Sequence, residues 1–330
     1  MRVGAVDCGT NSIRLLVAET DTAGDATPDG GATAGGAPST DAPLREVVRR
    51  MEVVRLGQGI DVTGVIAPES MARTLAMCDE YAAQCEELGV ERVRFVATSA
   101  TRDAGNAAEF IAGVASAFAA WGIGPEVVTG AQEAQLSFDG ATGGLAAAGI
   151  PGPYLVVDLG GGSTEFVRGD THLEAGVSVD MGCVRFTERY LRSDPPADEE
   201  IAAASAQVDA ELDRVEEVVG PGGVASLVGL AGSVTTVTAH ALGLSTYERD
   251  LIHRRVLSVD EVGAACEDLL TMPRAQRAAL GFMHPGRVDV IGAGALIWSR
   301  IVRRVAERSG LREVVTSEHD ILDGIALSLR

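Results

Sequence analysis

Residues 155–167 read LVVDLGGGSTEFV, and this stretch decides how the rest of the chain is interpreted. An apolar run leads into Asp158, three glycines and a serine follow, and Glu165 opens a second apolar run. The pattern predicts two strands joined by a tight turn. Glycines in such a turn allow several backbone N–H groups to converge on one point, which suits a phosphate oxygen.

The same pattern occurs near the N-terminus, where residues 3–17 read VGAVDCGTNSIRLLV. Three pairs of residues match at one offset of 151 positions (158 − 7, 160 − 9, 163 − 12): Asp7 with Asp158, Gly9 with Gly160, and Ser12 with Ser163. One D-x-G-x-x-S sequence would be weak evidence, but two in matching strand contexts indicate an internal duplication. We therefore predict an α/β chain of two duplicated domains that face each other across a cleft.

The two copies differ at one charged position, because Arg14 in the first corresponds to Glu165 in the second. The first turn is therefore predicted to offer a phosphate-binding cation, and the second a carboxylate near Asp158. Two carboxylates can hold a hard divalent cation, and Mg²⁺ is the expected ion. Glycines replace Thr10 and Asn11 in the second copy, which lets a ligand approach the backbone closely. A glycine hairpin with two solvated acids is the alternative, and the repeat argues against it.

The overall charge is acidic, with 47 acidic against 27 basic residues and a net charge of −20. All of the basic residues are arginines, so a P-loop lysine and a Schiff-base lysine are both excluded. Nucleic-acid binding depends on basic surface, and we expect no nucleic-acid partner. If the substrate is an anion, arginines must form a local positive site against the field of the whole chain.

The cysteines indicate the compartment. Five of them are scattered without Cys-x-x-Cys spacing, which is typical of reduced thiols: Cys8, Cys78, Cys85, Cys183 and Cys266. The chain starts with a strand-like pattern and shows no cleavable leader. Its apolar runs are too short for a membrane span. We therefore expect a cytoplasmic protein without a membrane partner.

The length of 330 residues is enough for two domains with real cores. Residues 21–43 contain no aromatic, no basic residue and no aliphatic larger than alanine, and we predict a flexible loop between strands at 13–19 and 45–57. Further strands are expected at 92–100, 125–130, 225–232 and 312–317, and two strands joined by the glycine turn are expected within 154–169. Helices are expected at 68–88, 107–120, 131–149, 198–219, 232–242, 258–270, 273–280, 289–309 and 321–329.

Seven motifs along the chain resemble one known family: DCGTNSIRLLV, FVATSATRDA, TGAQEAQLSFDGA, VVDLGGGSTEF, DMGCVRFTERY, VGLAGSVTT and HPGRVDVIGAGA. In this order they are similar to the exopolyphosphatase and guanosine-pentaphosphate phosphohydrolase (Ppx/GppA) family, in the short two-domain form common in actinobacteria. The resemblance implies two actin-like, ribonuclease-H-like domains with an interdomain cleft. Domain I is expected to span residues 1–130, with about 311–330 returning to it, and domain II residues 131–310.

The resemblance also implies roles for individual residues. Glu133, in Gly130-Ala131-Gln132-Glu133-Ala134, matches the catalytic glutamate, whose expected task is that of general base toward the attacking water. Asp158 and Glu165 match the acidic positions around the metal, Mg²⁺. The following residues match phosphate-binding segments: Asn11, Ser12, Arg14, Ser99, Thr101, Arg102, Gly160, Gly161, Gly162, Ser163, Gly232 and Ser233.

Some positions leave alternatives open. The helix start at Gly232 and Ser233 suits an anion, but it is equally compatible with a packing turn. Arg185 and Arg287 either reach outer phosphates or form surface salt bridges. Two residues depart from the family pattern: Gln132 stands for a glutamate, and Asp323 stands where many relatives have an arginine.

The implied activity is Mg²⁺-dependent hydrolysis of the terminal phosphoanhydride bonds of inorganic polyphosphate, which releases orthophosphate. Hydrolysis of guanosine pentaphosphate at the same site is the near alternative. An ATP-dependent kinase or ATPase is a second class, and the match at Glu133 argues against it. A non-catalytic polyphosphate or nucleotide sensor is a third class, disfavoured by the retention of Glu133, Asp158 and Glu165. A homodimer is left open as a further expectation.

Overall fold

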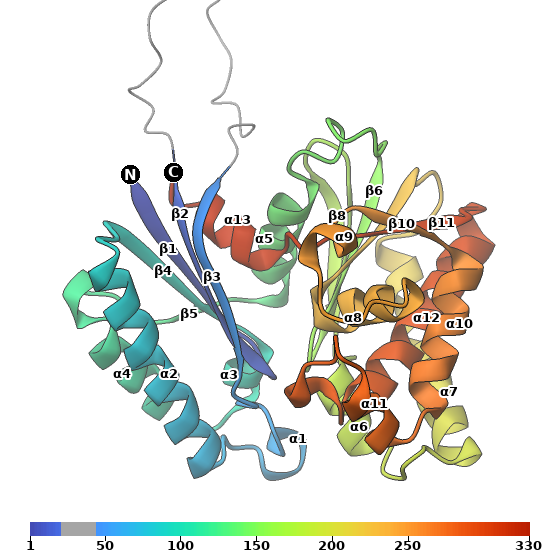
Figure 1. The fold of residues 1–330 in the computed structure, drawn as a ribbon, viewed down its shortest axis with the longest axis horizontal. Coiled ribbons are helices and arrows are strands. Elements are labelled where there is room, and N and C mark those ends of the chain that lie inside the picture. The colour runs from blue at the N-terminus through green and yellow to red at the C-terminus, as the bar shows by residue number, and fades with distance from the viewer. Residues whose placement is uncertain (21–43) are drawn as a thin grey trace, which may run out of the picture.

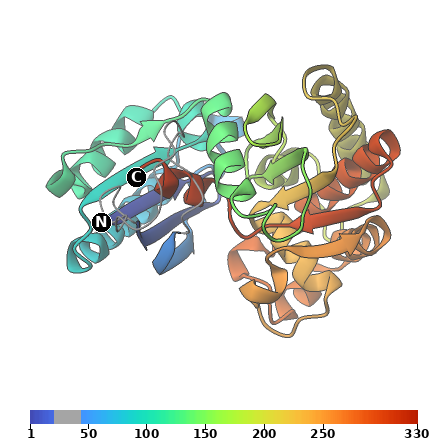
Figure 2. The ribbon, with the colours of Figure 1, turned by 90° about the horizontal axis from the view of Figure 1, so that it is seen from above.

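The computed structural model describes residues 1–20 and 44–330, so the predicted loop at 21–43 lies outside the described residues. The described chain forms two α/β domains side by side, each built on one mixed sheet (Figure 1). The view from above separates the N-terminal domain from the larger C-terminal one (Figure 2). No helix in the described part is long and apolar enough to cross a membrane.

Domain I contains a five-stranded sheet in the order β3-β2-β1-β4-β5. Its strands are β1 (Arg2–Cys8), β2 (Ser12–Glu19), β3 (Arg45–Val53), β4 (Arg92–Ala97) and β5 (Glu126–Val127). Its helices are α1 (Ile60–Thr63), α2 (Pro68–Glu87), α3 (Ser99–Asp103) and α4 (Ala107–Ala117). Helices α2 and α4 cover the outer face of the sheet (Figure 1), and Phe95, Phe110 and Phe118 fill the core between them.

Domain II contains a six-stranded sheet in the order β10-β11-β9-β6-β7-β8. Its strands are β6 (Tyr154–Leu159), β7 (Thr164–Gly169), β8 (Leu173–Val179), β9 (Ser226–Leu230), β10 (Arg255–Ser258) and β11 (Glu313–Thr316). Its helices are α6 (Cys183–Arg189), α7 (Asp198–Val218), α8 (Ala231–Ala241), α9 (Arg249–Ile252), α10 (Val259–Thr271), α11 (Arg274–Ala279) and α12 (Ile291–Ser309). The central strand β6 is buried along its whole length, which explains its nearly continuous apolar sequence.

The predicted duplication is confirmed by the topology. In domain I, β2 pairs antiparallel with both β1 and β3, while β1 pairs parallel with β4. In domain II, β7 pairs antiparallel with both β6 and β8, while β6 pairs parallel with β9. The register repeats as well, because Asp7 faces Arg14 and Asp158 faces Glu165. The two domains are therefore copies of one strand arrangement.

The domains are joined through two helices that lie between the sheets, α5 (Gly130–Thr142) and α13 (Ile321–Leu327) (Figure 1). Helix α5 packs against β7 and β8 of domain II, whereas α13 packs against β1 and β2 of domain I. The two helices meet at glycines. A Cβ at Gly140 would lie 1.9 Å from the Asp320 carbonyl oxygen, and a Cβ at Gly324 would lie 1.9 Å from that of Leu136. Only glycine fits at either point.

The C-terminal segment differs from the prediction. Strand and helix were both expected to return to domain I, but β11 pairs with β9 and β10 of domain II. Val314 and Val315 are buried there, and only α13 crosses back, where Ile325 packs with Val3 and Ala5. The helix predicted at 131–149 ends at Thr142. Strands β8 and β10 were not predicted.

Candidate functional site

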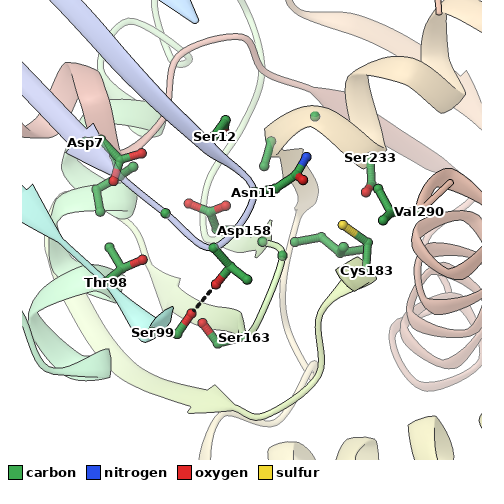
Figure 3. Close-up of a pocket in the computed structure, with 18 of the residues that line it drawn as sticks. Asp7, Asn11, Ser12, Thr98, Ser99, Asp158, Ser163, Cys183, Ser233 and Val290 are labelled. Atoms are coloured by element: carbon green, nitrogen blue, oxygen red, sulfur yellow. Dashed lines mark hydrogen bonds between the residues drawn. The ribbon is translucent and has the colours of Figure 1, made fainter. Parts of the chain in front are cut away.

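The two repeated turns meet in a cleft of about 100 Å³ between the domains (Figure 3). Most of the predicted site residues line it: Asn11, Ser12, Arg14, Ser99, Glu133, Asp158, Gly160, Gly161, Ser163, Glu165, Gly232 and Ser233. Thr101, Arg102 and Gly162 are not among the lining residues. The fold therefore brings predicted residues that are distant in the sequence together in one site.

The carbonyl groups of the second turn accept hydrogen bonds from the first residues of α6. The pairs are Gly160 O with Cys183 N (3.0 Å), Gly161 O with Val184 N (2.9 Å), and Gly162 O with Arg185 Nε (2.7 Å). In a trans peptide the C=O and the following N–H point in opposite directions. The N–H groups of Gly161, Gly162 and Ser163 consequently point away from α6, and none of them donates to an acceptor in the described part of the chain.

The first turn is built in the same way, with the segment after β3 in the place of α6. Thr10 O accepts from Gly57 N at 2.8 Å, and Asn11 O accepts from Val54 N at 3.0 Å. Each turn is also closed by one equivalent bond, Gly9 N to Ser12 O (2.9 Å) in the first and Gly160 N to Ser163 O (3.0 Å) in the second. The cleft thus has two opposed turns whose carbonyls are already paired. Their free amides suit phosphate oxygens.

The glycines of the second turn have an additional role, because domain I approaches them closely. A Cβ at Gly161 would lie 3.0 Å from Cβ of Thr10, and a Cβ at Gly162 would lie 2.6 Å from Oγ of Ser99. The hydroxyls of Thr10 and Ser99 are themselves 2.8 Å apart (Figure 3). Gly161 and Gly162 therefore admit the neighbouring domain as well as a ligand.

Four buried carboxylates surround this cleft, and they come from β1, α5, β6 and β7: Asp7, Glu133, Asp158 and Glu165. Two serine hydroxyls orient the last two, since Ser137 Oγ lies 2.6 Å from Oδ2 of Asp158 and Ser178 Oγ lies 2.6 Å from Oε1 of Glu165. Sequence reasoning gave no role to Asp7, Ser137 or Ser178. The repeat offset that pairs Asp7 with Asp158 was the signal available for Asp7.

The carboxylates have perturbed acidities because they are buried close together. Burial raises the pKa of Glu133 to about 7, with Arg102 opposing and Asp158 adding to the shift. Burial and then the charge of Asp320 raise the pKa of Asp158 to about 6. Burial and the neighbouring Glu133 raise the pKa of Glu165 well above its usual value. Such clustered shifts are typical of functional sites.

Arg102 and Thr101 lie behind the cleft rather than in its lining. Arg102 Nη1 donates to Oε2 of Glu133 and to the Val128 carbonyl, at 2.8 Å each. Thr101 is buried, and its hydroxyl has no hydrogen-bond partner within the described residues. In this arrangement Arg102 holds the carboxylate of Glu133, and neither side chain is placed to contact a phosphate in the cleft.

Arg14, Arg287 and Arg185 differ in whether a carboxylate already pairs with them. Arg14 donates to Oδ2 of Asp7 at 2.9 and 2.7 Å and also contacts Asp320, a residue that sequence reasoning missed. Arg287 lines the cleft and donates to the Gly232 carbonyl at 3.1 Å, and no carboxylate pairs with it in the part of the chain that is described. Arg185 is buried in interdomain salt bridges, so of its two alternatives the salt bridge is the one observed.

Both departures from the family pattern have a local explanation. Gln132 is exposed and closes a capping box at the start of α5, where its Oε1 accepts from Thr129 N at 2.9 Å. Asp323 closes the corresponding box at α13, accepting from Asp320 N at 3.0 Å, and it also accepts from Arg49. Neither residue lines the cleft.

The donor set fits a hard cation. Its members are carboxylates, and Oδ1 of Asp7 is buried without a hydrogen-bond partner in the described chain. No three His, Cys, Asp or Glu side chains in residues 1–20 and 44–330 converge into a preassembled metal cluster. Mg²⁺ usually takes one or two protein carboxylates together with water and substrate phosphates. Asp158 and Glu165, with Asp7 beside them, match that requirement.

Comparisons with known proteins agree with this geometry. Residues 37–329 match the Ppx/GppA phosphatase family. Exopolyphosphatase 2 of Mycobacterium tuberculosis is 46% identical over 330 residues, which cover 99% of this chain and 98% of that protein. A bifunctional 3-dehydroquinate synthase/phosphatase of Fusobacterium nucleatum is 27% identical, and the match covers 98% of this chain but 46% of that longer protein.

Solved structures match over the same length. An exopolyphosphatase-like protein superposes with a TM-score of 0.90 at 39% identity, covering 100% of this chain and 98% of that one. The Ppx/GppA family member from Aquifex aeolicus superposes with a TM-score of 0.75 at 28% identity, covering 100% of this chain and 97% of that one. The fold is thus shared with these proteins over the whole length of the chain.

Proposed function

Since this chain belongs to the Ppx/GppA phosphatase family, we propose that it is an exopolyphosphatase, which releases orthophosphate from the ends of inorganic polyphosphate. The observation that carries the proposal is the placement of Glu133 in one cleft with two opposed turns of free amides. An enzyme of this type needs donors for the phosphoryl oxygens and one base for water, and no covalent nucleophile.

In the proposed reaction, the amides of Asn11, Gly161 and Ser163, which line the cleft, hold the terminal phosphoryl group. Glu133 accepts a proton from a water molecule while the water oxygen bonds to the terminal phosphorus. The bond from that phosphorus to the bridging oxygen breaks, and the bridging oxygen leaves as the new end of the shortened chain. A carboxylate pKa of about 7 suits a base that works near neutral pH.

We propose Asp158 and Glu165 as the residues that hold Mg²⁺ at this site. When bound, the ion neutralises the charge that develops on the phosphate oxygens. The burial of both carboxylates supports the assignment: burial raises the pKa of each, and a bound cation would favour their ionised forms. The hydroxyls of Ser137 and Ser178 fix their orientation.

The rest of a polyphosphate chain has space in an adjoining cavity of about 480 Å³, which shares Arg14, Gly232 and Arg287 with the cleft. Five arginines line that cavity: Arg14, Arg49, Arg50, Arg249 and Arg287. Four of them form salt bridges with carboxylates, and Arg287 has no carboxylate partner within the described residues. Guanidinium groups beside the cleft support an extended polyanion as the substrate, with Arg287 as the charge that is not yet paired.

Guanosine pentaphosphate is the second candidate substrate, and one observation favours it. Apolar and aromatic groups line the same cavity beside the arginines, namely Met51, Tyr247, Phe282 and Met283. A purine ring needs such surfaces, whereas a polyphosphate chain does not.

The decisive experiment measures orthophosphate release from tripolyphosphate, long-chain polyphosphate, guanosine pentaphosphate and ATP, each with and without Mg²⁺. We expect Mg²⁺-dependent release from one or both polyphosphates, and ATP as the poorest substrate. Release from guanosine pentaphosphate alone would replace the first candidate by the second. Binding without release from any substrate would contradict both and support a sensor.

We also propose a cytoplasmic location, supported by the five cysteines, which are all buried and unpaired. The expected homodimer remains a prediction, and sedimentation analysis would test it.

A further inference from the structure

Arg185 links three parts of the molecule from one buried position. Its Nε donates to the carbonyl of Gly162 at 2.7 Å, Nη1 contacts Asp61, and Nη2 lies 2.7 Å from Oδ2 of Asp103. The side chain is 9% exposed. Gly162 belongs to the amide turn of domain II, whereas Asp61 in α1 and Asp103 in α3 belong to domain I. The guanidinium of Arg185 therefore connects the turn at Gly162 to domain I.

The contact with Gly162 affects the geometry of the cleft. Its carbonyl is the one of the three in the glycine run that accepts its bond from a side chain, since the others accept from backbone N–H groups of α6. Because C=O and the next N–H are opposed in a trans peptide, this bond fixes the direction of the Ser163 amide. No other donor among the described residues holds this carbonyl, so the bond from Arg185 is what restrains the peptide between Gly162 and Ser163.

The two carboxylates connect this geometry to domain I. Asp103 ends the short helix α3, which also carries Arg102, and Arg102 in turn holds Glu133. Asp61 is 11% exposed and stands at the start of α1, where Gly59 N also donates to Glu188 of domain II at 3.0 Å. When the domains are apart, Arg185 loses Asp61 and Asp103 and keeps one charged neighbour, Asp180 of its own domain, whose Oδ1 lies 3.9 Å from Nη2. The orientation of a buried arginine is fixed best when all of its guanidinium N–H groups donate hydrogen bonds.

We propose that Arg185 is a positioning residue that couples closure of domain I onto domain II to the orientation of the Ser163 amide. The inference rests on the proposed phosphatase function for its kinetic consequences, but the coupling itself concerns binding of a phosphate chain. The bonded guanidinium aligns the Ser163 amide, and a substrate that bridges the two domains stabilises the arrangement in which Arg185 contacts both of them. Phosphate binding and domain closure then reinforce each other.

The test compares Arg185→Met with a matched control, Arg189→Met. Arg189 lies on the same helix and contacts the same Asp61, but it makes no contact with the glycine turn. Removal of one donor aimed at a developing negative charge typically costs about 10²–10³-fold in rate. We expect Arg185→Met to lower kcat/KM about 10²-fold, Arg189→Met to change it less than about threefold, and the thermal midpoints of the two variants to agree within a few degrees.

Two further variants separate the effect of the Arg185 contact with Gly162 from the effect of its contacts with Asp61 and Asp103 in domain I. Asp61→Asn and Asp103→Asn leave the Gly162 contact in place, so we expect them to raise KM more than they lower kcat. Added guanidinium ion should partly restore the rate of Arg185→Ala, which a purely structural defect would not allow. Equal losses in Arg185→Met and Arg189→Met, tracking their stability, would overturn the proposal.

Binding provides a readout that does not depend on turnover. In a Glu133→Gln background, calorimetry with tripolyphosphate should show weaker binding when Arg185→Met is added and unchanged binding when Arg189→Met is added. If the parent protein releases no orthophosphate, the proposed function fails, yet this binding comparison still decides the role of Arg185. Unchanged tripolyphosphate affinity in the Arg185 variant would refute the coupling by itself.

Discussion

Arg102 Nη1 lies 2.8 Å from Oε2 of Glu133, and this ion pair joins the base of the proposed reaction to domain I. The arginine belongs to α3, and the glutamate belongs to the first turn of α5. Burial raises the pKa of Glu133, and Arg102 opposes that rise. The balance between the two sets the pH at which the glutamate can accept a proton, and two of the predictions below depend on it.

Glu133→Gln should lower orthophosphate release by about 10²–10⁴-fold, because the amide keeps the size of the side chain but cannot accept a proton. Tripolyphosphate binding, followed by calorimetry, should persist. Asp158→Asn should respond differently, since excess Mg²⁺ compensates for a weakened metal site but not for a missing base.

Gln132→Glu is the control for that comparison. It adds a carboxylate next to Glu133, but position 132 is exposed at the cap of α5, where a glutamate closes the same capping box. The rate should stay within about threefold of that of the parent protein. Turnover equal to the parent's in Glu133→Gln would remove this glutamate from the mechanism.

The rate should fall as the pH falls through about 7, because Glu133 acts as a base only when deprotonated. Arg102 lowers that pKa, so Arg102→Gln should raise it and move the acidic limb of the kcat/KM profile to higher pH. Arg94→Gln is the control, since Arg94 pairs with Glu126 away from the cleft. Superimposable profiles of the Arg102 variant and the parent would disprove the coupling.

Glu133→Gln should also be more stable than the parent protein at pH 8. The folded-state pKa of Glu133 is raised above its unfolded value, so its contribution to stability is complete below about pH 4.5 and is lost as the pH rises through about 7. Glutamine avoids that loss. We expect a difference on the order of 1–3 kcal/mol at pH 8 that nearly disappears at pH 5, measured by urea unfolding. A variant that is less stable at both pH values would contradict the burial argument.

Gly324→Ala should destabilise the fold by about 1–3 kcal/mol or more, because the new methyl group would lie 1.9 Å from the Leu136 carbonyl oxygen and a backbone atom cannot move aside easily. Gly263→Ala is the matched control in α10, where nothing lies within 4 Å of the added Cβ. Alanine is the better helix former there, so its thermal midpoint should be unchanged or higher. Similar midpoints for both variants would argue against a close helix crossing.

The sequence predicted those features that repeat or that lie in local motifs. The match of Asp7 with Asp158 predicted the duplicated strand pairs, and the run of three glycines predicted the turn whose N–H groups face the cleft. Strand β8 was missed because Glu174, Ala175 and Gly176 in its sequence, LEAGVSV, have low strand propensity, although the apolar residues alternate. The segment is ordered by pairing with β7.

Contacts between distant segments could not be predicted from spacing. Asp320 reaches Arg14 across 306 residues, and Arg185 reaches Asp61 across 124, so no local pattern signals either pair. The destination of β11 depends on burial of Val314 and Val315 in the core of domain II, which a strand pattern alone cannot assign to one of two similar sheets.

The glycine crossing of α5 and α13 has a mechanical consequence. The described chain passes between the domains only beside these helices, and their backbones touch too closely to slide. The remaining bridges between the domains include ion pairs such as Arg55 with Asp289, at 2.9 Å, which water can replace when they open. We expect the two domains to rotate relative to each other about the contact between α5 and α13, and small-angle scattering with and without tripolyphosphate would measure this rotation. Residues near that contact, such as Asp320, would then move least, and residues far from it, such as Arg55, would move furthest.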